Sequence, residues 1–101
     1  MAEINHHSAL LLDSDFGGTD LPAVYILSAV RTPIGKFGGT LASLTAADMG
    51  VIAAKAAMER AGVEPAQVEE TIFGNARQAG GGPNAARQIS VRSGVRQEVP
   101  A

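Results

Sequence analysis

One stretch decides the fold that we expect for this chain: Val24-Tyr25-Ile26-Leu27-Ser28-Ala29-Val30-Arg31-Thr32-Pro33-Ile34-Gly35-Lys36-Phe37-Gly38-Gly39. The part from Val24 to Val30 is a nearly continuous apolar run with β-branched residues, which is typical of a strand buried on both faces in the middle of an α/β sheet. Pro33 cannot donate to a strand ladder, and the glycines after it permit backbone angles closed to other residues. A long, shaped loop is therefore expected to follow the strand.

A helix is predicted to begin at Thr45-Ala46-Ala47-Asp48, which has the spacing of a capping box. Gly62-Val63, followed by Pro65, is the pattern of a Schellman-like stop. The abundance of alanine implies close approach to a partner, which is either the sheet or another helix. The face that we expect to pack inward consists of Met49, Ile52, Ala53, Ala56, Ala57 and Arg60.

The second half of the chain repeats this order of elements. Pro65 to Val68 is typical of one helical turn, and Thr71 to Ala76 of a second strand. A helical connection between two strands predicts that they are parallel and joined by a right-handed crossover. Gln78 to Pro83 then forms a glycine-rich loop, and a second helix is predicted from its cap at Asn84 to Ser93.

Length and composition are those of one small globular domain: 101 residues, 46% hydrophobic and a net charge of -2. That charge argues against bulk attraction to nucleic acid. Residues 1–22 read as a flexible N-terminal extension and 23–101 as the folded part. The extension is acidic, and its apolar run is too short for a signal peptide or a membrane span. We therefore expect a cytoplasmic protein without membrane contact.

Ligand-binding patterns in the chain are weak. His6-His7 supply neither the ligand count nor the supporting carboxylates of a metal site, so no metal is predicted. The loop from Gly80 to Asn84 precedes a helix and either holds an anion or is a structural turn, and we prefer the turn. The scattered arginines of residues 71–101 either bind an anionic ligand or lie on solvent-exposed faces and in ordinary ion pairs, and we prefer the second interpretation. These arginines are Arg77, Arg87, Arg92 and Arg96.

Several blocks of the chain, in the right order and with matching spacing, resemble the N-terminal segments of thiolases. The blocks are Val24 to Gly39, Ala47-Asp48-Met49-Gly50, Ala61-Gly62-Val63, Ile72-Phe73-Gly74-Asn75-Ala76, and Gln78-Ala79-Gly80 through Asn84-Ala85-Ala86-Arg87-Gln88. The resemblance covers residues 23 to 101, and Arg31-Thr32-Pro33-Ile34-Gly35 favours thiolases over the related ketoacyl synthases. Pro83-Asn84-Ala85 departs from the more usual Gln-Asn-Pro wording of that loop.

The resemblance implies an α/β fold: a layered α/β/α/β/α thiolase fold of two similar halves. This chain would supply only the first two parallel strands and helices of the N-terminal half. The complete enzyme would be an acyl-CoA C-acyltransferase, such as an acetyl-CoA acetyltransferase of fatty acid metabolism. It would transfer acyl groups between coenzyme A and a cysteine, in Claisen condensation or thiolytic cleavage of 3-ketoacyl-CoA. In thiolases that cysteine follows a strand just beyond the equivalent of Pro100-Ala101.

The chain contains no cysteine, so it lacks the family's nucleophile and is predicted to be inactive alone. A serine hydroxyl needs a placed base to act instead, and the histidines lie in the expected extension. We therefore assign no catalytic, cofactor-binding or metal-binding residue. The serines interpreted as structural are Ser28, Ser43, Ser90 and Ser93.

Three functions stay open at this point. The first is an N-terminal thiolase segment that provides scaffold and subunit contacts, with Arg87 and the loop before it at an interface. Its partners would be the remainder of the thiolase chain or another subunit, in a homodimer or homotetramer, with coenzyme A thioesters as substrates of the complete enzyme and none bound by this segment. The second is a non-catalytic fragment that docks on a thiolase subunit through an exposed sheet edge. The third is a small phosphate-binding module that uses the Gly80 to Asn84 loop.

Overall fold

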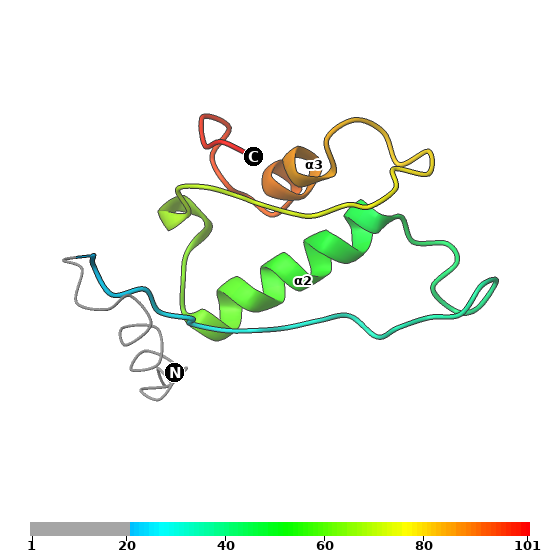
Figure 1. Cartoon of the computed structure of the whole chain (residues 1–101), viewed down its shortest axis with the longest axis horizontal. Helices are drawn as coiled ribbons and strands as arrows, with labels where there is room; N and C mark the ends of the chain where they lie inside the picture. The colour runs from blue at the N-terminus through cyan, green and yellow to red at the C-terminus, as the bar shows by residue number, and fades with distance from the viewer. Residues whose placement is uncertain (1–20) are drawn as a thin grey trace.

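The computed structural model describes residues 21–101. It contains helix α2 (Ala46–Ala61), the single 3-10 turn η1 (Pro65–Gln67) and helix α3 (Ala85–Arg92). In Figure 1 the segment that precedes α2 and the segment that follows η1 both run lengthwise along α2. The predictions for residues 1–20, which include most of the expected extension and His6-His7, lie outside the described residues.

The predicted start and stop of α2 are both confirmed. The Thr45 side chain accepts a hydrogen bond from the Asp48 N–H at 3.1 Å, and the Thr45 N–H donates to Asp48 Oδ2 at 2.8 Å. At the other end Gly62 has φ 69°, which an L side chain rarely adopts. The Val63 N–H donates to the Met58 carbonyl at 3.0 Å, which completes the Schellman motif.

The predicted signals of α3 are confirmed in the same way. The Arg87 N–H donates to Asn84 Oδ1 at 3.0 Å, and the helix ends at Arg92. Gly94 has φ 88°, and the Val95 N–H donates to the Ser90 carbonyl at 3.1 Å. The helical turn predicted after Pro65 is also present, as η1.

The core lies where α2 and α3 cross. Ala47, Val51 and Ile89 form the buried cluster, with Ala54 packed against it. The partner of α2, which the sequence left open between sheet and helix, is therefore a helix over this face. Gly50 lies at the closest approach, because a Cβ there would come within 2.8 Å of Ile89 Cγ1.

The inward face predicted for α2 was wrong in its register. Ile52, predicted to be buried, is 54% exposed, whereas Ala47 is 3% exposed. An alanine-rich helix has several apolar stripes of similar strength, so periodicity alone does not single one out. The position of the only glycine inside α2 decides the register, because it lets Ile89 approach.

The two predicted strands are extended but form no ladder within residues 21–101. Residues 24–30 were expected to be buried on both faces, yet Val24 is 65% exposed and Ile26 59%. A buried strand needs neighbouring strands at its edges and packed layers on both faces. The described part of the chain provides neither a second helical layer nor further strands. Ser28, which donates to the Ala57 carbonyl at 2.8 Å, ties this segment to α2.

An ion pair links the first turn of α2 to the last turn of α3. Arg92 Nη2 lies 2.7 Å from Asp48 Oδ1. The backbone hydrogen bond from Thr45, followed by the side-chain hydrogen bond from Arg92, lowers the pKa of Asp48 from 3.8 to about 2. The carboxylate thus caps one helix and contacts the other.

We predict that Gly50→Ala destabilises the chain. The added methyl group would collide with Ile89, and overpacking of this kind costs ~1–3 kcal/mol. This exceeds the roughly 1 kcal/mol that alanine gains over glycine in a helix. The free energy of unfolding from urea denaturation measures the change.

The matched control is Ile89→Val, which removes the methyl carbon nearest to the new Cβ. The Gly50→Ala methyl group would collide with an atom that Ile89→Val removes. The double variant should therefore lose less stability than the sum of the losses of the two single variants. Strict additivity would contradict the packing described for this position.

Asp48→Asn should remove one acid-sensitive contribution to stability. The pKa of Asp48 is lower in the folded chain than in the unfolded chain. The ionised side chain therefore contributes fully to stability above pH 3.8, and this contribution is lost as the pH falls toward 2. Asparagine keeps an acceptor for the Thr45 N–H but carries no charge. The difference in unfolding free energy between wild type and variant should therefore shrink across this pH range. A constant difference would contradict the assignment.

Candidate functional site

The described residues contain no constellation that could carry nucleophilic catalysis. Within 21–101, no group of three or more His, Cys, Asp or Glu side chains is placed to hold a metal ion. The structural interpretation of the serines is supported for the two with hydrogen-bond partners. Ser28 donates to α2, and Ser90, which is 1% exposed, accepts from Thr71 Oγ1 at 3.3 Å. Ser93 is buried at the end of α3, and Ser43 is exposed.

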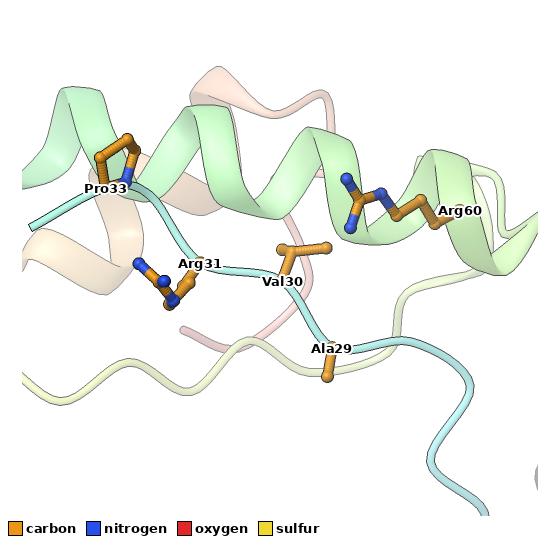
Figure 2. A pocket seen from close by; sticks show the side chains of 5 residues that line it. All are labelled: Ala29, Val30, Arg31, Pro33 and Arg60. Carbon is orange, nitrogen blue, oxygen red and sulfur yellow. The ribbon is translucent and has the colours of Figure 1, made fainter.

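An open hollow with two arginines lies between the first extended segment and the C-terminal end of α2. Its volume is about 660 Å³. Figure 2 shows the Arg60 side chain running from α2 toward Val30, while the Arg31 side chain points away from Arg60. Arg31 Nη1 donates to the neighbouring Thr32 carbonyl at 3.2 Å. Because the two guanidinium groups do not converge, the hollow lacks the arrangement of an anion-binding pocket.

A second hollow, of about 260 Å³, is apolar and lies between α2, α3 and residues 68–73. Ala57 and Met58 line it from α2, Ile89 and Ser93 from α3, and Phe73 from the extended segment. Neighbouring Ile72 is 81% exposed. This hollow continues the helix-helix core toward the segment that was expected to be the second strand.

The first segment and its loop form a third apolar surface. Ile34 is 92% exposed and Phe37 is fully exposed, beside a hollow of about 510 Å³ that reaches Met49. Val24 and Ile26 extend this apolar surface along the chain. Exposed apolar groups of this kind are found at interaction sites, in ligand-binding grooves and on aggregation-prone surfaces.

Arg87, which was expected to contribute to an interface, is half-buried and binds the C-terminal segment of its own chain. Its Nη1 donates to the Val99 carbonyl at 2.9 Å, and its Nη2 donates to the Gln97 carbonyl at 2.5 Å. Asn84 Nδ2 donates to the Ala101 carbonyl at 3.2 Å. The sequence analysis did not identify these partners.

The glycine-rich loop is closed on itself. Gln88 Nε2 donates to the carbonyls of Gly81 at 3.0 Å and Pro83 at 2.8 Å. Ala79 and Gly82 have positive φ values of 47° and 86°. The Asn84 side chain already caps the helix that follows. These contacts support the structural turn over the anion site, because the Gln88 side chain holds the loop carbonyls and the Asn84 side chain accepts from the Arg87 N–H at the start of α3.

The other arginines fit the interpretation as ordinary ion pairs and solvated groups. Arg92 pairs with Asp48, and Arg96 lies 3.4 Å from Glu98 with both side chains largely exposed. Arg77 is exposed.

None of the helices within 21–101 combines the length and the apolar character that crossing a membrane requires.

Comparison with known proteins adds a family likeness. A family profile described as "Thiolase, N-terminal domain" matches residues 24–101. The acetyl-CoA acetyltransferase of Cupriavidus necator is 51% identical over 78 residues, which cover 77% of this chain and 20% of the relative. An acetyl-CoA acetyltransferase of Clostridioides difficile is 45% identical over 78 residues, which cover 77% of this chain and 73% of that relative.

A solved structure shows the same likeness in three dimensions. The Acat5 thiolase from Ascaris suum, crystallised in complex with coenzyme A, matches with a TM-score of 0.74 and 48% identity. The match covers 76% of this chain and 20% of that one. The chain thus spans about a fifth of the length of this structure and of the Cupriavidus relative.

The closed loop leads to a prediction about ligands and stability. Inorganic phosphate or coenzyme A at saturating concentration should leave the melting temperature of the chain unchanged. Gln88→Ala should lower stability by ~1–2 kcal/mol, because it removes both hydrogen bonds to the loop. Gln97→Ala, at an exposed position, is the matched control. A ligand-induced rise in melting temperature would contradict the structural interpretation and favour the phosphate-binding module.

Proposed function

The chain belongs to the thiolase family, and from this premise we propose that it is the N-terminal scaffold segment of an acyl-CoA C-acyltransferase. The predicted thiolase-like α/β fold is confirmed by the match to the Ascaris thiolase. Helices α2 and α3, with the extended segments around them, form the corresponding part of this fold. The segment's contribution is therefore structural support for chemistry carried by other residues.

The proposed reaction is acyl transfer between coenzyme A and a cysteine, in Claisen condensation or thiolytic cleavage of 3-ketoacyl-CoA. The names of the relatives support acetyl-CoA as a substrate, and the Ascaris structure is a complex with coenzyme A. The present chain has no cysteine, so coenzyme A thioesters are substrates of the complete enzyme rather than ligands of this segment. We place the enzyme in fatty acid metabolism in the cytoplasm, since a relative from Gibberella zeae is described as cytosolic.

One observation carries this proposal: the part of the chain that matches the thiolase profile leaves large apolar groups uncovered. Ile34, Phe37 and Ile72 are each more than four-fifths exposed. Exposing such groups to water is unfavourable by about 25 cal/mol for each Å² of apolar surface. We propose that the remainder of a thiolase chain or another subunit covers them, in a homodimer or homotetramer.

The extended segments also support an alternative function. Residues 24–30 and 72–76 have backbone N–H and C=O groups without ladder partners within the described residues. Such groups can pair with an exposed sheet edge of another protein. The alternative is therefore a non-catalytic fragment that docks on a thiolase subunit.

A chimeric enzyme tests the scaffold function. Residues 24–101 replace the matched segment of the Cupriavidus relative, which differs at about half of the aligned positions. If the segment is a thiolase scaffold, the chimera should retain acetyl-CoA acetyltransferase activity within about tenfold, or roughly 1.4 kcal/mol of activation free energy. The 101-residue chain alone should show no turnover.

A folded chimera without activity would contradict the proposal. The unmodified relative is the positive control, and circular dichroism establishes whether the chimera is folded. Co-elution of the free chain with the unmodified relative in size-exclusion chromatography would favour the docking alternative instead.

A further inference from the structure

We propose that Arg87 is a positioning residue that fixes the C-terminal segment, Gln97–Ala101, and thereby orients the polypeptide that follows it in the complete acyltransferase. This inference rests on the proposed function, because it assigns the segment a place within a longer enzyme. Arg87 touches neither substrate nor cofactor in this account. It acts through the backbone that it holds.

The contact is bidentate and made to backbone atoms two residues apart. Two guanidinium nitrogens of Arg87 donate separately to the carbonyls of Gln97 and Val99. A planar guanidinium holds both acceptors in a fixed relative orientation, whereas a lysine ammonium acts as a single point charge. Arg87 therefore sets the direction of the C-terminal segment as well as its distance from α3.

The carbonyls at the end of the segment alternate in direction, as they do in a strand. Those of Val99 and Ala101 accept from side chains of α3 and its cap, Arg87 and Asn84. The Pro100 carbonyl between them accepts from the Thr71 N–H at 3.0 Å. Successive carbonyls of a strand point to opposite sides. After the turn at residues 96–99, the segment is joined to the chain at Thr71 by this one backbone hydrogen bond.

The support beneath this contact is well anchored. Val95 and Val99 are 7% and 4% exposed, so burial of these two side chains stabilises the turn between them. Arg87 lies in the first turn of α3, and Ile89 on the same helix packs against Gly50 of α2. Arg87 therefore holds the end of the segment in a fixed position relative to α2 and α3.

Arg92 offers a matched control on the same helix. Its guanidinium pairs with the Asp48 side chain and makes no hydrogen bond to residues 97–101. Replacing either arginine with lysine preserves the charge. Only Arg87→Lys removes a bidentate contact to the C-terminal segment.

The test uses the chimeric enzyme with Arg87→Lys or Arg92→Lys. Misplacement of about 1 Å remote from the chemistry can lower a rate by about a hundredfold, so we expect Arg87→Lys to lower kcat by about ten- to a hundredfold. The KM for acetyl-CoA should stay within about twofold, since the contact is not part of substrate binding. Amide hydrogen exchange at residues 97–101 should accelerate, and Arg92→Lys should change neither kcat nor this exchange.

Asn84→Asp is a second variant that preserves the helix cap. Aspartate keeps the acceptor for the Arg87 N–H but loses the donor to the Ala101 carbonyl. It should therefore produce a smaller effect in the same direction. If Arg87→Lys prevents folding, Asn84→Asp decides the question by the same measurements.

Several results would overturn the inference. These are an Arg87→Lys enzyme with unchanged kcat, an effect equal to that of Arg92→Lys, or unchanged exchange at residues 97–101. An inactive chimera with both arginines intact would instead count against the proposed function. In that case the exchange of residues 97–101 in the folded chimera, with and without Arg87→Lys, still decides whether Arg87 holds the segment.

Discussion

The close approach of α2 and α3 at Gly50 is the constraint on which the rest of the structure depends. Ile89 occupies the space that any side chain at this position would fill, and the buried cluster of Ala47, Val51 and Ile89 surrounds this contact. The Asp48 to Arg92 ion pair fixes the same helix pair at one end. Since Arg87 projects from α3, the C-terminal segment is positioned relative to this crossing as well.

The apolar surfaces outside the helix pair explain why the chain is interpreted as a scaffold. Within residues 21–101 few hydrophobic residues are buried, and none of them is aromatic: Ala47, Val51, Ile89, Val95 and Val99. The large apolar residues Ile34, Phe37 and Ile72 remain exposed. A small domain already buries a modest fraction of its surface, so it gains stability when further elements cover such groups. The match to the Ascaris thiolase, which covers only 20% of that chain, is consistent with this requirement.

The sequence predicted the helix ends, which depend on residues nearby in the chain. It did not predict the buried faces, which depend on residues far away in the sequence. Thr45, Asp48, Gly62 and Asn84 set helix ends through partners only a few positions away, so spacing alone located them. The buried face of α2 depended on Ile89, which is remote in sequence, and the alanine-rich pattern did not identify it. Burial of residues 24–30 requires neighbours that the described chain does not contain. The lack of the cysteine nucleophile is a property of the sequence itself, whereas the partners of Arg87 lie 10 and 12 residues away and depend on the path of the chain after α3.

The central claim is that residues 24–30 and 72–76 are strands of a thiolase sheet that needs further neighbouring strands from outside this chain. Amide hydrogen exchange of these residues, compared between the free chain and the chimeric enzyme, tests it most directly. The account predicts rapid exchange in the free chain and strong protection in the chimera, where neighbouring strands supply hydrogen-bond partners. Equal exchange in both proteins would contradict it.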